Sequence, residues 1–137
     1  HLTLFHALPG ADPDALLATV APLTRRAPFA VAVEGVMPLG RGVAYRLAAS
    51  PLLAIRKPLA ARFADVLTRQ DREKFRPHIT VQNKVSPQEA RATLEHLAAH
   101  FTSFEATARG LQLWWSRGGP WQPLAAVPFA APSAGRG

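Results

Sequence analysis

The sequence contains no cysteine, which excludes disulfide bonds, thiolate nucleophiles and cysteine-based zinc sites. No apolar run approaches the roughly 20 residues that a transmembrane helix needs, and no segment has the pattern of a signal peptide. We therefore expect a cytoplasmic protein with no membrane partner, since the lack of cysteine fits a reducing compartment. The chain has 137 residues and 48% of them are hydrophobic, which is enough for a packed interior.

Acidic residues are also scarce, with 9 Asp and Glu against 16 Lys and Arg and a formal net charge of +7. A basic chain attracts phosphate-bearing partners such as nucleotides and nucleic acids through its long-range field. The alternative is the ordinary solvated surface of an arginine-rich protein. The charge alone does not decide between these two interpretations.

Hydrophobic periodicity and turn residues divide the sequence into two similar series of elements, each a strand, a capped helix and a hairpin. The first series is predicted as a strand over 1–8, a helix from 13 to about 26, a hairpin of 29–36 and 43–49, and a further helix over 50–67 that Pro58 should kink or split. After a charged connector, the second series is predicted as a strand over 77–82, a helix that begins after Ser86, a strand over 104–116, a turn over 117–120 and a strand over 121–129.

The repeated order of elements predicts an internal duplication. We expect a single domain over residues 1–129, with halves at roughly 1–69 and 70–129. The tail over residues 130–137 is rich in small residues and is predicted to be disordered. Because the chain begins in the middle of a predicted strand, we also expect that an N-terminal segment is missing from it.

The same short pattern opens both halves, as His1-Leu2-Thr3-Leu4 and His78-Ile79-Thr80-Val81. Side chains alternate along a strand, so each histidine and threonine should face a cleft while the apolar pair enters the core. With five histidines in the chain, two His-x-Thr matches arise by chance in roughly three chains per hundred. The alternative is that these residues only decorate the polar faces of two half-buried strands.

Two imidazoles and two hydroxyls around one small volume suit phosphoryl transfer without a metal. One neutral imidazole can take a proton from water or a ribose hydroxyl, and the other, protonated, can give a proton to the leaving oxygen. The threonine hydroxyls can donate to the non-bridging phosphate oxygens. Which histidine is the acid and which is the base is not set by the sequence.

Several other histidines and cations have plainer structural interpretations beside their functional ones. His6 should lie on the opposite strand face from His1, in a packing or rim role. His96 and His100 have metal-ligand spacing on a helix but no evident third ligand, so we expect a solvated face there. Four cations could bind a phosphate. Arg76 and Lys84 flank the second motif, and Arg41 and Arg46 are on the first hairpin.

The paired motifs, and above all the form Arg76-Pro77-His78-Ile79-Thr80-Val81, resemble the signatures of the 2H phosphoesterase superfamily. The resemblance is to its bacterial branch of 2′,5′ RNA ligases and RNA 2′,3′-cyclic phosphodiesterases, and it extends from His1 to about Phe129. Members of that branch carry a strand and a helix before the first motif, so we expect these elements to be missing here.

This resemblance implies an α+β fold, with two pseudo-symmetric lobes of antiparallel sheet, outer helices and a central cleft. It implies His1 and His78 as catalytic acid and base, with Thr3 and Thr80 binding phosphate, to which the flanking Arg76 is added as a phosphate ligand. No cofactor and no metal are expected. The predicted partner is a nucleotide or RNA with a cyclic or 2′-linked phosphate, handled by a monomer.

Two functions from different classes therefore stay open. The first is a cyclic phosphodiesterase, for which ligation is the same chemistry in reverse. The second is a basic RNA-binding module that retains the fold and turns nothing over. The second predicts salt-dependent binding of RNA ends without any product.

Overall fold

The computed structural model describes residues 1–10, 12–115 and 120–132, and their contacts group the chain into two compact units. Unit 1 consists of residues 1–9 and 30–106, and unit 2 consists of residues 10–29 and 107–137. Unit 1 thus takes residues from both predicted halves. The boundary near residue 69 therefore does not coincide with the division between compact units.

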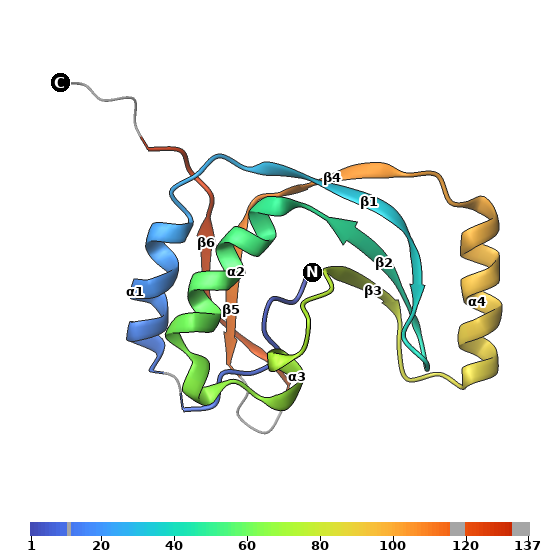
Figure 1. Ribbon diagram of the computed structural model, residues 1–137, viewed down its shortest axis with the longest axis horizontal. Coiled ribbons are helices and arrows are strands. Elements are labelled where there is room, and N and C mark those ends of the chain that lie inside the picture. The colour runs from blue at the N-terminus through green and yellow to red at the C-terminus, as the bar shows by residue number, and fades with distance from the viewer. Residues whose placement is uncertain (11, 116–119, 133–137) are drawn as a thin grey trace. The chain divides into compact units, whose positions relative to one another are not determined.

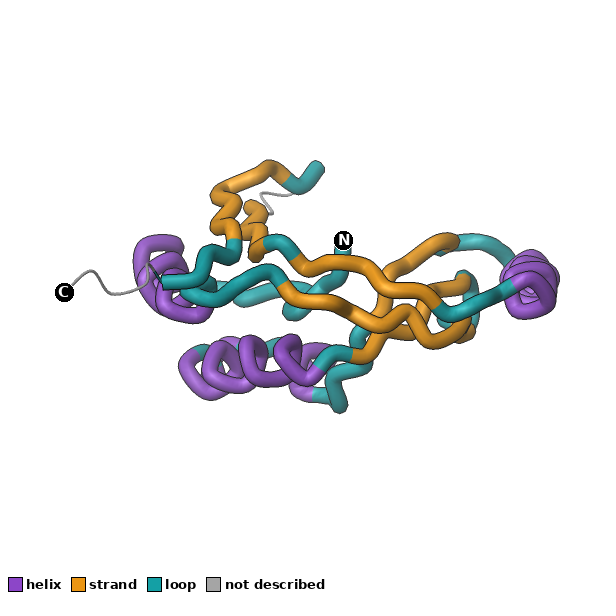
Figure 2. The backbone as a smooth tube through the Cα atoms, turned by 90° about the horizontal axis from the view of Figure 1, so that it is seen from above, coloured by secondary structure: helices purple, strands orange, loops and turns teal. Residues whose placement is uncertain are grey.

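The predicted α+β class, with antiparallel sheets and helices, is confirmed (Figures 1 and 2). The helices are α1 (Pro13–Leu23), α2 (Ser50–Arg62), the 3-10 turn η1 (Ala64–Val66), α3 (Arg69–Arg72) and α4 (Pro87–His100). The strands are β1 (Phe29–Pro38), β2 (Val43–Ala48), β3 (His78–Gln82), β4 (Phe104–Ala108), β5 (Gly110–Trp115) and β6 (Gln122–Pro128). In the described part of the chain, no helix is both long and apolar enough to cross a membrane.

The larger sheet has four strands in the order β3-β2-β1-β4, and β5 and β6 form a separate two-stranded sheet. The β1–β2 hairpin predicted from the sequence is present, with Val33 opposite Leu47 and a register shift between Val33 and Gly35. Both residues of that pair are buried, as the alternation along the strands requires. The core of unit 1 combines these strand residues with the inner face of α2, and its fully or nearly buried apolar side chains include Val31, Val33, Val43, Leu47, Leu52, Ile55, Leu59 and Phe63.

The helix starts that were predicted from capping residues are confirmed. The Asp12 carboxylate accepts from the Ala15 N–H at 3.3 Å at the start of α1. At the start of α4 the Ser86 hydroxyl accepts from the Glu89 N–H at 3.1 Å. Each cap satisfies one of the backbone donors that a helix N-terminus leaves unpaired.

Three predictions about the elements were wrong. Residues 1–8 form no strand, because side chains of α2 and α3, rather than a neighbouring strand, bind their backbone. The long strand over 104–116 is two strands, which pair with β1 and with β6 respectively. The helix predicted over 50–67 ends at Arg62, and Pro58 lies inside it without splitting it.

Two further predictions concern segments that the structure describes only in part. The turn predicted over 117–120 includes residues 117–119, which lie outside the described residues. Of the predicted disordered tail, residues 133–137 also lie outside them. Within the described part, the Ala130 N–H donates to the Thr24 carbonyl at 3.0 Å, so the backbone is bonded within unit 2 up to that point.

Candidate functional site

The second motif lies on β3, an outer strand of the four-stranded sheet that pairs antiparallel with β2. His78 stands opposite Arg46, and Thr80 stands opposite Ala44. Directly opposed residues of an antiparallel pair share a face, so His78, Thr80 and Arg46 project from the same side of the sheet. Tyr45 lies on the other face, where its ring contacts those of Phe101 and Phe104.

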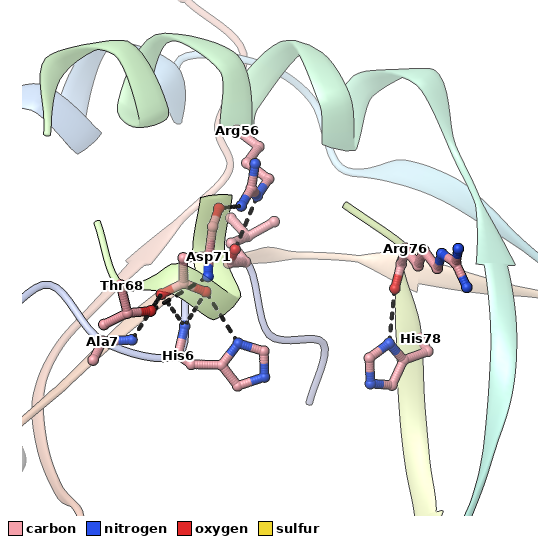
Figure 3. Close-up of polar contacts among 8 residues, drawn as sticks. His6, Ala7, Arg56, Thr68, Asp71, Arg76 and His78 are labelled. Atoms are coloured by element: carbon pink, nitrogen blue, oxygen red, sulfur yellow. Dashed lines mark hydrogen bonds and ion pairs between the residues drawn. The ribbon is translucent and has the colours of Figure 1, made fainter. Parts of the chain in front are cut away.

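The imidazole of His78 is oriented by the backbone two residues earlier. Its Nδ1 lies 2.7 Å from the Arg76 carbonyl oxygen (Figure 3). A carbonyl oxygen can only accept, so Nδ1 must carry the hydrogen of this bond. The nitrogen that His78 has left to exchange a proton with a ligand is therefore Nε2.

Arg76 meets His78 through its main chain rather than through its charge. Its side chain is exposed, and Figure 3 shows the guanidinium directed away from the His78 ring. In this arrangement Arg76 orients the imidazole. Its predicted role as a phosphate ligand stays a prediction.

The apolar half of the second motif is less buried than the strand pattern predicts. Val81 is 47% exposed and Ile79 is half-buried. The expectation that both enter a core was wrong for Val81, and Ile79 is only partly covered. The alternating pattern predicted the strand β3 correctly, but it overestimated how deeply the apolar side chains are buried.

The first motif lies in the strand-free segment at the start of unit 1. His1 and Thr3 are exposed while Leu2 and Leu4 are half-buried, so the alternation of the motif is retained without a strand. All predicted site residues belong to unit 1. Their convergence on one phosphate stays a prediction.

An anchor that the sequence did not predict holds the segment that follows the first motif. The Asp71 carboxylate, 2% exposed, accepts from the backbone N–H of His6 at 2.9 and 3.0 Å and of Ala7 at 3.1 Å. It also contacts His6 Nδ1 at 3.0 Å and accepts from the Thr68 hydroxyl at 3.3 Å. Figure 3 shows these contacts converging on one carboxylate.

Hydrogen bonding decides the ionisation of this buried acid. Burial raises the pKa of Asp71, but the backbone N–H groups of His6 and Ala7, with the His6 side chain, outweigh burial and hold the pKa below its ordinary value. A depressed carboxylate pKa contributes stability at pH values above about 4. That contribution is lost as the pH falls through the lowered pKa.

Arg56 on α2 binds both the N-terminal segment and α3. Its guanidinium donates to the Leu4 carbonyl at 3.0 Å and to the Asp71 carbonyl at 2.8 Å. It also lies over the rings of Phe5 at 4.6 Å and Phe75 at 4.8 Å, as arginine does at planar aromatic sites. Burial lowers the pKa of Arg56, and the charge of Asp71 opposes this.

One sequence signal indicates part of this anchor. Thr68 and Asp71 have the spacing of a capping box, and the Thr68 hydroxyl accepts from the Asp71 N–H at 3.3 Å to begin α3. The partner of Asp71, however, lies 65 residues away in the chain. His6 was predicted to have a packing or rim role, and it contacts Asp71 while its side chain is 46% exposed.

Arg46 lies on the same sheet face as His78, on the neighbouring strand β2. A Cβ built on Gly35 would lie 3.0 Å from its Nη2 atom, so the guanidinium rests over the bare backbone of β1. Its Nε lies 4.0 Å from Glu34, and its side chain is 55% exposed. Such an exposed ion pair is weak, so an anionic ligand can compete for Arg46.

The two histidines of α4 do not form a metal site with other side chains of the described residues. His96 and His100 are exposed on α4, with ring centroids 5.1 Å apart. Within residues 1–10, 12–115 and 120–132, no three His, Cys, Asp or Glu side chains are grouped so that they could hold a metal ion.

Comparisons with known proteins agree with this architecture. The sequence profile described as the 2'-5' RNA ligase superfamily matches residues 1–120. A crystal structure of TT0787 from Thermus thermophilus superposes with a TM-score of 0.64 at 20% sequence identity, over 96% of this chain and 78% of that one. At this identity the likeness shows the fold. No curated protein sequence matches the chain significantly.

Proposed function

Since the chain belongs to the 2'-5' RNA ligase superfamily, we propose that it is a metal-independent phosphodiesterase in which His1 and His78 act as general acid and base. The substrate class is a nucleotide or RNA with a 2′,3′-cyclic or related 2′-linked phosphate. The observation that supports this most directly is the bond from His78 Nδ1 to the Arg76 carbonyl, 2.7 Å long. It leaves Nε2 to exchange a proton with substrate.

The proposed reaction is hydrolysis of one phosphoester bond. One neutral imidazole removes a proton from water, whose oxygen forms a new bond to phosphorus. The bond from phosphorus to the ribose oxygen breaks, and the protonated imidazole gives that oxygen a proton. Thr3 and Thr80 donate to the non-bridging oxygens, where negative charge is held in the transition state. For both imidazoles to reach one phosphorus, their ring nitrogens must lie roughly 5–8 Å apart in the substrate complex.

The proposal is tested with a panel of the four nucleoside 2′,3′-cyclic phosphates and a 2′,5′-linked dinucleotide. We expect a phosphomonoester product from the cyclic compounds, at a rate that EDTA does not change. Absence of product from every member of the panel would contradict the proposal, and so would loss of activity with the chelator.

The second candidate function is an RNA-binding module without turnover, which the net charge of +7 supports. It predicts binding of single-stranded RNA that weakens steeply with salt, and no product from any cyclic substrate. Turnover of any member of the panel eliminates a pure binder. Ligation is the reverse reaction and is detected by supplying RNA ends in place of a cyclic nucleotide.

Arg46 is expected to bind a second phosphate in substrates longer than one nucleotide, because it projects from the same sheet face as His78. We expect Arg46→Ala to raise KM for a cyclic-phosphate oligonucleotide about 10-fold, the equivalent of roughly 1.4 kcal/mol, and to leave KM for the cyclic mononucleotide nearly unchanged. The slope of log KM against log salt concentration should fall by about 0.7, the value expected for the loss of one phosphate contact with a single-stranded nucleic acid.

The matched control for Arg46→Ala is Arg91→Ala, which removes the same charge from the exposed face of α4 in unit 1. If both variants weaken oligonucleotide binding equally, the effect is general electrostatics and the specific role of Arg46 is wrong. If Arg46→Ala impairs the mononucleotide as strongly as the oligonucleotide, Arg46 acts on the reacting phosphate instead.

A further inference from the structure

The Asp71 anchor raises the question of why a buried carboxylate binds a segment that forms no helix or strand. Residues 1–9 carry the first motif, and α2 and α3 bind residues 4–7 through side chains. Elsewhere in unit 1, backbone donors of the sheet pair with other strands. Asp71 therefore supplies the acceptors that a neighbouring strand would supply to His6 and Ala7.

We propose that Asp71 is a positioning residue for the first motif, which it holds in place by binding the backbone of His6 and Ala7. The inference rests on the proposed function, because it concerns where that site's first histidine and threonine are held. Asp71 itself does not touch the reacting phosphate. Its effect passes along the chain from His6 to Thr3 and His1.

The geometry supports a fixed segment rather than a loose one. A single carboxylate accepts two consecutive backbone N–H groups, which fixes the peptide plane between His6 and Ala7 as well as its position. Arg56 fixes the last residue of the motif itself, because it donates to the Leu4 carbonyl. Charged partners make each of these bonds stronger than a neutral one. From Leu4, only Thr3 and Leu2 separate the anchored backbone from His1.

The contact with the His6 side chain has a smaller part in this arrangement. Its Nδ1 meets Asp71 at 3.0 Å, and nearly half of the side chain is exposed. Removing the imidazole leaves the His6 N–H in place, so the backbone bonds to Asp71 persist. This separates the anchor from a direct catalytic role of His6, since the two predict opposite rankings of the variants.

The first test compares Asp71→Asn, His6→Ala and the control Asp65→Asn, which makes the same change at an exposed acid in η1. An asparagine at 71 has no charge, and its amide nitrogen can only donate, so one of the two oxygens that face the donors of His6, Ala7 and Thr68 is replaced by a group that cannot accept from them. The bonds that remain also lose the strengthening that a charged acceptor gives. We expect kcat to fall about 10²-fold in Asp71→Asn, as for a catalytic group displaced by about 1 Å. KM and the shape of the pH–rate profile should change little.

The loss in His6→Ala should be clearly smaller, and Asp65→Asn should match the wild type. If His6→Ala loses more activity than Asp71→Asn, or removes one limb of the pH–rate profile, His6 acts in the chemistry and the positioning role of Asp71 is overturned. An Asp71→Asn variant within about twofold of the wild type also overturns it, since that change is only about 0.4 kcal/mol.

Amide hydrogen exchange gives a readout that does not depend on turnover. In the wild type the N–H groups of His6 and Ala7 should be protected by Asp71, and in Asp71→Asn they should exchange at least about 10-fold faster while β1 and β2 exchange as before. Unchanged exchange at His6 and Ala7 contradicts the anchor. If the wild type turns over no cyclic substrate but the amides respond as expected, the anchor stands and the proposed function fails.

A variant that keeps Asp71 intact guards against unfolding of Asp71→Asn. Arg56→Lys retains the charge but loses the planar group that binds the Leu4 and Asp71 carbonyls and lies over two phenylalanine rings. We expect an intermediate loss of kcat with cooperative thermal unfolding retained. Wild-type kcat in a folded Arg56→Lys protein would overturn the proposal, because it would show that the segment needs no anchor.

Discussion

Replacement of His78 by alanine is expected to lower kcat for a nucleoside 2′,3′-cyclic phosphate by roughly 10²–10⁴-fold, the range for loss of a general acid or base. The reason is specific to its geometry. The Arg76 carbonyl holds Nδ1 at 2.7 Å, so Nε2 is directed to exchange the proton and no other nitrogen of that residue replaces it. Initial rates over a range of substrate concentrations separate this loss from a change in KM.

The control for that variant is His96→Ala, which removes an exposed histidine from α4 and should retain wild-type kcat. Arg76→Ala should cost less than His78→Ala, because His78 bonds the main-chain carbonyl of Arg76, which alanine also provides. Activity of His78→Ala within a few-fold of the wild type would remove His78 from the chemistry.

The parts of the fold that were predicted correctly depend on short-range signals. The caps at Asp12 and Ser86 and the β1–β2 hairpin need only residues a few positions apart. The same kind of signal at Thr68 and Asp71 marks the start of α3, which composition alone had assigned to a charged connector. The capping pattern at Thr68 therefore held information about α3 that the charge of the segment did not give.

The parts that could not be predicted depend on contacts between distant residues. Residues with alternating apolar side chains form a strand only where another strand is available to pair with them. The backbone of residues 1–8 instead bonds to the side chains of Asp71 and Arg56. Likewise, no pattern in 104–116 shows that β4 and β5 pair in different sheets. The break falls at Arg109, and β5 begins at Gly110. A Cβ added to Gly110 would lie 2.6 Å from the Val127 carbonyl oxygen, so the close approach of β6 requires a glycine.

The candidate site shows the same division. The motif identified His78 and Thr80 as residues of one strand face, which β3 confirms. The tautomer of His78 depends on the backbone carbonyl of Arg76, and spacing alone does not give this. The position of Arg46 over Gly35 depends on the register of β1 against β2. The sequence thus predicts which residues share a strand face, and contacts between distant parts of the chain decide how their side chains are oriented.

The other large effect is expected at the first motif, where His1→Ala should also lower kcat by roughly 10²–10⁴-fold. The more informative measurement is the double variant His1→Ala/His78→Ala. If the two imidazoles move protons in one concerted step, removing the second after the first should cost far less than its single effect, as for residues that act as a unit.

The kcat of the wild type, both single variants and the double variant is therefore measured at saturating cyclic nucleotide, with Thr3→Val as a milder change in the same motif. Thr3→Val should cost about 10²-fold or less, because it removes one hydroxyl donor to the phosphate and leaves both imidazoles. Losses in the double variant that equal the product of the single losses would mean that the histidines act independently. A His1→Ala protein with wild-type kcat beside an inactive His78→Ala protein would show that the chemistry depends on the second motif and not on His1, because proton transfer at His1 would then contribute nothing to the transition state.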